Sequence, residues 1–231
     1  MLEFKDFSLS YGKSEKILDR VNLTFSPGTV HVITGKSGSG KTSLIRAVNG
    51  IIPEIIPADL SGTINYCEKP LLPMTISERS QLIGTVFQNP KNQFYAVNVK
   101  DEMAFALENR GIPREEILRR IDYYADQLEL KQLLDKDLMT LSGGEKQRVA
   151  IASVAMMDNA VYVFDEPSAS LDQHSIQKIK DIIVKLKDAG KIILIAEHRL
   201  YYLNDVMDSL CIIDHGRLIQ YNRDEIDEQV I

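Results

Sequence analysis

The chain has 231 residues, of which 44% are apolar, and a formal net charge of −6 at pH 7. This length and apolar content predict one substantial core with a small subdomain attached, and they argue against two large domains. A chain that holds nucleic acid by neutralising its phosphates over a broad surface is usually basic, so the negative charge argues against nucleic acid as a partner and leaves only a local basic patch as an alternative.

Two further features concern location and redox state. The apolar runs are far shorter than the ~18–20 residues that span a bilayer, and the start MLEFKDF has no basic segment followed by an apolar stretch. We therefore expect a soluble, cytosolic chain. Cys67 and Cys211 are far apart and the histidines are scattered, which predicts neither a disulfide framework nor a zinc site.

The predicted elements begin with strands. LEFKDFSLSY and ILDRVNLTF alternate apolar and polar residues, which is typical of antiparallel strands with one solvated face. After a Ser-Pro-Gly turn at 26–28, TVHVITG is β-branched and apolar without alternation, as in a strand buried on both faces of a parallel sheet. A glycine-rich loop and a helical pattern at 42–52, TSLIRAVNGII, follow.

The next segments alternate between strands and helices. Residues 53–75 carry prolines and turn residues, and LIGTVFQ at 82–88 then predicts a strand. Residues from about 98 to 136 have a charged helical pattern, which predicts a helical subdomain. AVYVFDE and KIILIAEH predict buried strands separated by the amphipathic helix SIQKIKDIIVKLKDAG, and DHGR predicts a hairpin. This alternation indicates an α/β fold.

GKSGSGKT, from Gly35 to Thr42, fits the pattern of Gly, four residues and Gly-Lys-Ser/Thr between a strand and a helix. Such glycines let backbone N–H groups point at phosphate oxygens, next to the positive end of the following helix. Lys41 would reach the β- and γ-phosphates and the Thr42 hydroxyl would bind Mg²⁺. A flexible glycine-rich turn is the alternative. The candidate nucleotide-binding residues here are Gly35, Lys36, Ser37, Gly38, Ser39, Gly40, Lys41, Thr42 and Ser43.

An acidic pair follows the predicted strand AVYVFDE. Carboxyl ends of parallel strands line the ligand crevice of such sheets, so Asp165 and Glu166 could both face a bound nucleotide. Asp165 would then hold Mg²⁺ and Glu166 would polarise an attacking water. Taken alone, the pair could equally be a helix cap or a solvated loop.

A second glycine motif, LSGGEKQR, precedes the helical pattern VAIASVAMM. Ser142 followed by Glu145 predicts a capping box. Gly143 and Gly144 would lie in the first helical turn, where glycine has poor helix propensity but where exposed N–H groups form an anion site. Two phosphate-binding helix ends in one chain can be reconciled if each completes the other's site in a dimer.

LSGGEKQR resembles the signature motif of the ATP-binding cassette (ABC) ATPases. The other elements of that family stand in the same order over essentially the whole chain. They are Tyr11 at the place of the adenine-stacking aromatic, the phosphate loop at 35–42, Gln88, the strand VYVFDE, SASLD at 168–172 and His198 after a strand.

The resemblance implies an α/β P-loop NTPase (RecA-like) fold with a parallel-sheet core, an N-terminal antiparallel β subdomain and an inserted helical subdomain. The chain 1–231 would be one nucleotide-binding domain. Residues 1–88 and about 160–231 would form the core with its β subdomain, and about 89–159 the helical subdomain with the signature motif.

It also implies a head-to-tail dimer with a second ABC ATPase subunit, identical or different. ATP and Mg²⁺ would lie between one phosphate loop and the partner's Ser142, Gly143 and Gly144, while Asp172 would cross the interface. Glu166 would be the general base.

The resemblance implies roles for three more residues, each with a structural alternative. His198 would contact the γ-phosphate and the attacking water, or it is a strand-end hydrogen-bonding residue. Gln88 would touch Mg²⁺ or that water, or it is a polar residue at a strand end. Tyr11 would stack on adenine, or it is a core aromatic.

Among ABC ATPases, a short cassette without a coiled-coil insert fits a transporter subunit better than the DNA-repair or ribosome-acting classes. FQNPKNQF, with Gln93 as its second glutamine, and AEHRL at 196–200 are similar to the ATPases of energy-coupling factor importers, which take up vitamins or transition-metal ions. The partners would be a transmembrane coupling subunit, contacted by the segment that Gln93 opens, and a substrate-binding membrane subunit. The ATPase would lie on the cytoplasmic face of the membrane.

Alternatives and a departure remain. Importers of amino acids, peptides or metals are the runner-up class. Many energy-coupling factor ATPases continue into a C-terminal dimerisation segment, whereas this chain ends at Ile231 soon after its predicted hairpin. It is either a shorter member or one half of a tandem protein.

Overall fold

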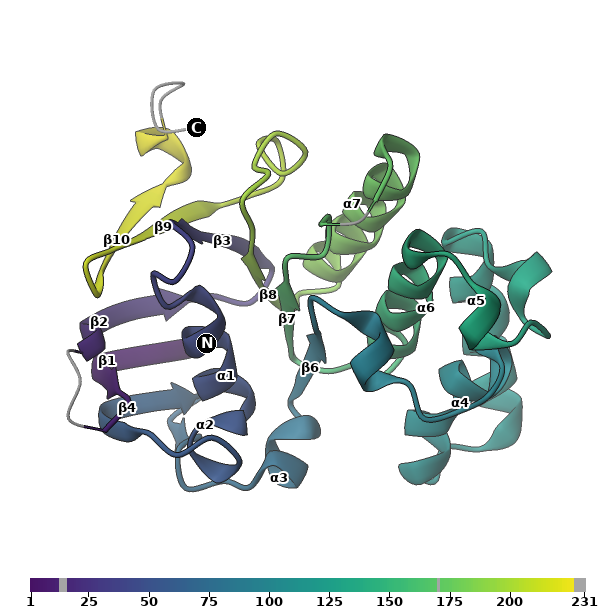
Figure 1. Cartoon of the computed structure of the whole chain (residues 1–231), viewed down its shortest axis with the longest axis horizontal. Coiled ribbons are helices and arrows are strands. Elements are labelled where there is room, and N and C mark those ends of the chain that lie inside the picture. The colour runs from purple at the N-terminus through teal and green to yellow at the C-terminus, as the bar shows by residue number, and fades with distance from the viewer. Residues whose placement is uncertain (13–15, 170, 227–231) are drawn as a thin grey trace.

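The computed structural model describes residues 1–12, 16–169 and 171–226 (Figure 1). Ser170 of SASLD and residues 227–231 therefore lie outside the described residues. The strands are β1 (Leu2–Ser10), β2 (Lys16–Phe25), β3 (Thr29–Gly35), β4 (Asp59–Tyr66), β5 (Lys69–Pro70), β6 (Ile83–Val86), β7 (Val161–Asp165), β8 (Ile192–Ala196), β9 (Ser209–Asp214) and β10 (Arg217–Asn222). The helices are α1 (Lys41–Asn49), α2 (Ile51–Glu54), α3 (Ile76–Ser80), α4 (Val99–Asn109), α5 (Arg114–Gln127), α6 (Gly143–Ala155) and α7 (Gln173–Asp188), with 3₁₀ turns η1 (Pro90–Gln93), η2 (Lys131–Leu133), η3 (Leu138–Thr140) and η4 (Arg223–Glu225).

The first sheet is antiparallel, with the order β2-β1-β4-β5. β1 and β2 confirm the two strands predicted at the start of the chain. No strand was predicted for residues 53–75, and that prediction was wrong because β4 lies there. Gly62 in β4 has φ 76°, and a Cβ on it would lie 2.3 Å from the carbonyl oxygen of Asp6. The glycine thus allows β4 to pass an irregularity in β1 and does not mark a turn.

The second sheet has the order β10-β9-β3-β8-β7-β6. Its neighbouring strands are parallel except for the β9–β10 hairpin, which confirms the hairpin predicted around DHGR. Val32 of β3 packs in the core that the larger helices share, whereas the next residue, Ile33, packs in the core shared with the first sheet and α1. β3 is therefore buried on both faces, as its unbroken apolar pattern predicted.

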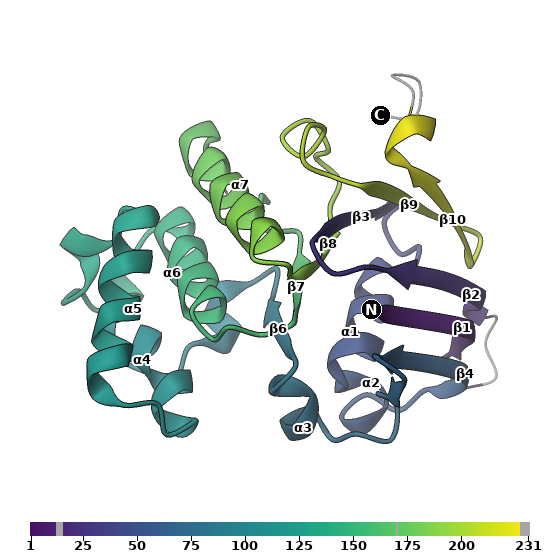
Figure 2. The ribbon, with the colours of Figure 1, turned by 180° about the vertical axis from the view of Figure 1, so that it is seen from behind.

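The helices α4 and α5 lie at one end of the molecule and the antiparallel sheet lies at the other, in both views (Figures 1 and 2). α6 contacts α4, α5 and α7, and α7 contacts β8 and β3. The helical pattern predicted for residues 98–136 is confirmed, although the subdomain limits stay a prediction. In the described part of the chain, no helix has the length and apolar character needed to cross a membrane.

The helix predicted for residues 42–52 is shorter in the structure. α1 ends at Asn49 because Gly50 takes a left-handed conformation with φ 93°. Arg79, which is 1% exposed, donates hydrogen bonds from Nη1 to the carbonyl oxygens of Ala47 and Val48 at 2.6 and 3.2 Å. The buried guanidinium thus satisfies carbonyls at the end of α1, and the prediction of a continuous helix through residue 52 was wrong.

Candidate active site

The order of the second sheet brings the predicted site residues to one edge. β3, β8, β7 and β6 are adjacent and parallel, so their carboxyl ends point the same way. The phosphate loop, His198, the acidic pair and Gln88 follow these four strands in turn. All of these except Asp165 border a hollow of about 360 Å³ that is lined by Tyr11, Ile17, Ser37, Gly38, Gly40, Lys41, Thr42, Ser43, Gln88, Glu166 and His198.

Lys41 lies beneath the phosphate loop and is 5% exposed. Its Nζ donates hydrogen bonds to the carbonyl oxygens of Gly35 at 2.8 Å and Lys36 at 3.1 Å. Burial lowers the pKa of Lys41, while the charges of Glu166 and Asp165 oppose that shift. A nearly buried ammonium held by loop carbonyls is suited to an anionic ligand such as a phosphate.

The loop needs glycine at two positions for steric reasons. Gly35 has φ 150°, and a Cβ there would lie 2.5 Å from the carbonyl oxygen of Ile213 in β9. Gly40 has φ 110°, and its Cβ would lie 2.9 Å from Cγ2 of Ile17. The close approach of the loop to β9 and β2 therefore excludes larger residues and keeps the backbone N–H groups in place.

Thr42 and Asp165 place two oxygen atoms next to each other. Thr42 Oγ1 donates to Asp165 Oδ1 at 3.4 Å, and Asp165 is 5% exposed. Burial raises the pKa of Asp165, and the neighbouring charge of Glu166 raises it further. A hydroxyl and a buried carboxylate that lacks a full ion pair fit Mg²⁺, which prefers oxygen ligands.

Glu166 is the point where three predicted residues meet. Its Oε2 accepts a hydrogen bond from Gln88 Nε2 at 2.7 Å, and its Oε1 lies 3.4 Å from His198 Nε2. Its backbone is left-handed, with φ 47°, and its N–H donates to Ala196 at 2.8 Å. Side chains that follow β6 and β8 thus converge on the carboxylate that follows β7, beside the phosphate loop.

The remaining nucleotide-binding candidates lie at the rim. Tyr11 OH and Ser43 Oγ are 3.0 Å apart, which fixes the tyrosine over the start of α1. Lys36 and Ser39 border a neighbouring hollow of about 310 Å³ on the β9–β10 side of the loop.

The signature motif has the predicted cap but lies apart from this hollow. Glu145 N–H donates to Ser142 Oγ at 3.3 Å and Ser142 N–H donates to Glu145 Oε2 at 2.7 Å, which confirms the capping box. Gly143 and Gly144 form the first turn of α6. Because none of Ser142, Gly143 and Gly144 lines the hollow, the structure of one chain does not bring them to the phosphate loop.

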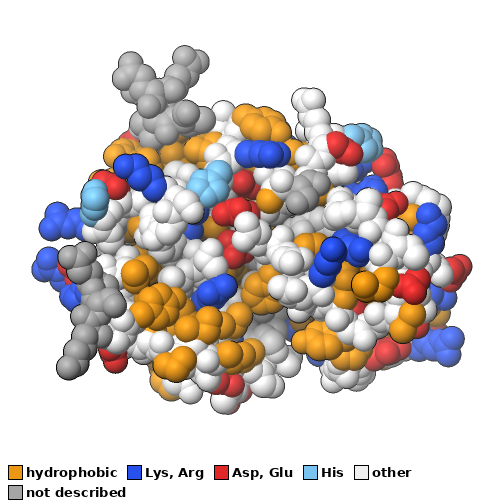
Figure 3. Space-filling view, viewed as in Figure 1, with side chains coloured by type: hydrophobic (Ala, Val, Ile, Leu, Met, Phe, Trp, Pro, Cys, Tyr) orange, Lys and Arg blue, Asp and Glu red, His pale blue; other side chains and the backbone are white. Residues whose placement is uncertain are grey.

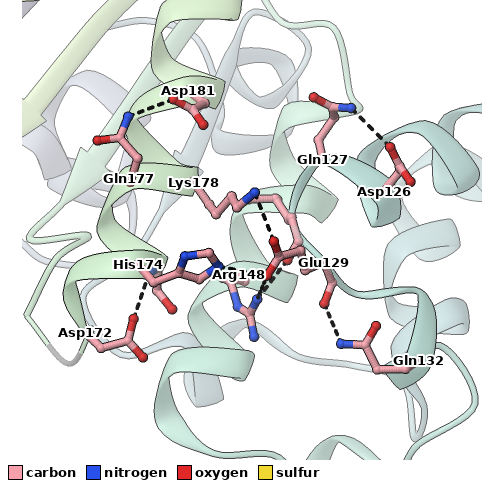
Figure 4. Close-up of polar contacts among 12 residues, drawn as sticks. Asp126, Gln127, Glu129, Gln132, Arg148, Asp172, His174, Gln177, Lys178 and Asp181 are labelled. Atoms are coloured by element: carbon pink, nitrogen blue, oxygen red, sulfur yellow. Dashed lines mark hydrogen bonds and ion pairs between the residues drawn. The ribbon is translucent and has the colours of Figure 1, made fainter.

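Asp172 caps α7, where its Oδ1 accepts from Ser175 N–H at 2.7 Å, and this bond lowers its pKa. Beside it, Glu129 joins the helical end of the molecule to α7 (Figure 4). Glu129 accepts from His174 Nε2 and Lys178 Nζ, each at 2.9 Å, and these bonds lower its pKa to about 2. This link was not predicted from the sequence because Glu129 and its two partners are 45 residues or more apart in the chain.

Two loop anchors were also not predicted from the sequence. Gln93 was expected to open a partner-facing segment, but its Oε1 turns back and accepts from Phe87 N–H at 3.0 Å. Glu102 is 6% exposed, and its Oε2 accepts from the N–H groups of Tyr95 and Ala96 at 2.8 and 2.9 Å. The segment between Gln93 and Glu102 is thus held by hydrogen bonds at both ends.

Known proteins are similar to this chain over most of its length. A family model described as ABC transporter matches residues 18–169. Two ABC transporter ATP-binding proteins of Treponema denticola are 39% and 38% identical over 97% and 94% of this chain, which covers 46% and 45% of their own length. The chain therefore spans about half the length of these curated relatives.

Solved structures are similar along the whole chain. The cbiO1 protein of Clostridium perfringens, described as part of the ABC transporter complex cbiONQ, is 31% identical with a TM-score of 0.85, covering 99% of this chain and 91% of its own. An ATP-binding subunit of an ABC transporter is 24% identical with a TM-score of 0.87, covering 99% and 92%, and it supports the fold.

Proposed function

Because this chain belongs to the ABC transporter family, whose ATP-binding members hydrolyse ATP, we propose that it binds Mg²⁺ and ATP and uses hydrolysis to drive transport of a small molecule across a membrane. The observation that carries this proposal is the convergence on Glu166. Gln88 and His198 both reach its carboxylate, next to the loop that holds Lys41.

The phosphate loop would hold the nucleotide. Lys41, poised under the loop, would bind the β- and γ-phosphates, and Tyr11 at the rim would stack on the adenine. Thr42, Asp165 and Gln88 would hold Mg²⁺, which when bound neutralises charge on the phosphate oxygens.

The acidic pair would divide its work between binding and catalysis. Asp165 is buried and paired with Thr42, so it is suited to the metal, whereas Glu166 faces the hollow. Glu166 would accept a proton from the attacking water, whose oxygen bonds to the γ-phosphorus as the bond to ADP breaks. His198 and Gln88 would orient the water and the transferring group by hydrogen bonds.

Two copies of the cassette would be needed for a complete site. The first turn of α6 presents N–H groups to solvent because Gly143 and Gly144 have no side chains to cover them, and Ser142 and Glu145 keep that turn ordered. We propose that this turn binds the γ-phosphate of the ATP that a second ATPase subunit, arranged head to tail, holds at its phosphate loop. Asp172 would lie at the same interface.

The segment after Gln93 would contact the membrane partner. Tyr95 is 77% exposed, Val97 is 72% exposed and Met139 is 79% exposed, and the Tyr95 ring stacks on Phe105 with centroids 5.2 Å apart. On the face seen in Figure 3, apolar side chains gather in several groups, and acidic and basic side chains lie between and around these groups. An exposed aromatic and aliphatic group fits a protein partner.

We propose that this partner is the transmembrane coupling subunit of an energy-coupling factor importer, which works with a substrate-binding membrane subunit to import a vitamin or transition-metal ion. The support is the likeness to cbiO1 together with FQNPKNQF and AEHRL. The chain would then lie on the cytoplasmic face of the membrane, held there by its partners.

Two measurements test the proposal. Purified protein should release phosphate from ATP only with Mg²⁺, and Lys41→Ala should abolish ATP binding. Affinity purification from detergent-solubilised membranes of the producing cells should recover a transmembrane protein. Recovery of ribosomes or DNA in place of a membrane protein would refute the transport role, and ATP binding by Lys41→Ala at wild-type affinity would refute the assigned site.

A further inference from the structure

Glu197, the residue before His198, has a buried side chain. It is 2% exposed and lies directly after β8, where its backbone N–H donates to Ile33 of β3 at 3.0 Å. Burial of a carboxylate is costly unless hydrogen bonds satisfy its oxygens. The identity of those donors therefore shows what the residue holds.

The two carboxylate oxygens serve two different loops. Oε1 accepts from the N–H groups of His198 and Arg199 at 2.8 and 3.2 Å. Oε2 accepts from the N–H of Ser168 at 3.4 Å and from Tyr202 OH at 3.0 Å. All four donors are uncharged, so the carboxylate acts as a bridge between backbones and not as half of an ion pair.

One loop carries His198, at the nucleotide site of the same chain, and the other leads to Asp172, which would lie at the interface with the second subunit. His198 faces the hollow of its own chain, whereas the carbonyl oxygen of Ser168 accepts a hydrogen bond from Leu171 N–H at 3.2 Å, and Leu171 precedes Asp172 at the start of α7. A second contact runs in parallel, because Arg199 Nη1 donates to the carbonyl oxygen of Ser168 at 3.4 Å. The Glu197 carboxylate and the Arg199–Ser168 hydrogen bond therefore both join the backbone around His198 to Ser168.

We infer that Glu197 is a positioning residue that couples His198 at one nucleotide site to the loop before Asp172, and through that loop to the second nucleotide site of the dimer. This inference rests on the proposed function. It gives the two sites a physical route for cooperation: when the γ-phosphate draws in His198, the Ser168 backbone follows and changes the surface that Asp172 presents to the second subunit.

The test uses a substitution that cuts one half of the bridge. In Glu197→Gln, the amide oxygen can keep both N–H bonds from His198 and Arg199, but the amide NH₂ cannot accept from Ser168 N–H. We expect the affinity for ATP to stay at the wild-type level, the maximal rate to fall about 10- to 100-fold because the loops are misplaced, and the sigmoidal dependence of rate on ATP to become hyperbolic.

Two tyrosine variants separate coupling from general damage. Tyr202→Phe removes the donor that fixes Oε2 while keeping the ring, so it should reduce cooperativity in the same direction by a smaller amount. Tyr162→Phe removes another buried hydroxyl, which donates a hydrogen bond to the carbonyl oxygen of Ala155 at 3.1 Å. This bond does not involve the nucleotide loops. The substitution should lower the thermal midpoint and leave cooperativity unchanged.

The outcomes distinguish this inference from the proposed function. A hyperbolic dependence of the wild-type rate on ATP, or a sigmoidal one that is unchanged in Glu197→Gln and Tyr202→Phe, would overturn the coupling role alone. Equal loss of cooperativity in Tyr162→Phe would overturn it as well. Absence of ATP hydrolysis by the wild-type protein would overturn the proposed function itself.

Discussion

Replacement of Glu166 by glutamine should separate ATP binding from ATP hydrolysis. The two side chains have nearly the same size, and the amide oxygen of glutamine can still accept the hydrogen bond that Gln88 Nε2 makes at 2.7 Å. Lys41 and its carbonyl contacts are not altered. Only the proton-accepting carboxylate is lost, so the arrangement of the site should survive.

The expected loss is that of a general base. General acid–base catalysis contributes about 10²–10⁴-fold to a rate, and we expect the turnover number of Glu166→Gln to fall by about that factor. This corresponds to about 3–5 kcal/mol in the activation free energy. Because bound ATP then persists, the variant should also form a closed dimer in the presence of ATP and Mg²⁺.

Phosphate release measures the turnover number, calorimetry measures the affinity for ATP, and light scattering after size exclusion measures dimer formation. Glu78→Gln is the matched control, because Glu78 also accepts hydrogen bonds, from Thr75 N–H at 2.8 Å and Thr75 Oγ1 at 2.9 Å, but lies on α3. It should keep the wild-type turnover. A turnover number of Glu166→Gln close to that of the wild type would remove Glu166 from the role of base.

Three further predictions concern the loops and the metal site. Burial and a neighbouring carboxylate raise the pKa of Asp165, so its ionised form disfavours the folded state and its contribution to stability falls as the pH rises through that pKa. Asp165→Asn should therefore raise the thermal midpoint of the nucleotide-free chain at neutral pH, and this gain should shrink at lower pH. A midpoint below that of the wild type at neutral pH would contradict the argument. Gly35→Ala should lower the free energy of unfolding in urea by about 1–3 kcal/mol more than Gly111→Ala, since both have positive φ but only the first would place a Cβ 2.5 Å from a backbone carbonyl; equal losses would show that the contact is relieved. Gln93→Ala opens the loop that its bond to a backbone N–H closes at 3.0 Å, so transport by the assembled complex should fall while ATP affinity is retained, and unchanged transport would count against this role.

The parts of the fold that the sequence predicted are those whose signals are local. The phosphate loop lies between a buried strand and a helix within a few residues, and the cap at Ser142 needs only the side chain at Glu145. The convergence of Gln88, Glu166 and His198 was implied by family resemblance. It depends on the order of β3, β8, β7 and β6, which residue patterns alone do not specify.

Buried carboxylates and β4 were missed for physical reasons. Glu197 and Glu102 are charged residues, which are mostly exposed, and their burial depends on backbone N–H groups from other loops. The glycine at Gly62 suggests a turn when the sequence is read locally. Its actual cause is the irregularity in β1, which is about 55 residues earlier in the chain and could not be predicted from the neighbouring residues.

The position of β3 between β8 and β9 also determines when the site can form during protein synthesis. The strand that precedes the phosphate loop is translated before both of its hydrogen-bonded neighbours, Ile192–Ala196 and Ser209–Asp214, which leave the ribosome only after the helices α4 to α7. Until then its apolar edges are unpaired, which is a state prone to aggregation. The nascent chain therefore cannot complete the strand pairing around its phosphate loop before β9 has been translated, and chaperone dependence should be greatest in that interval.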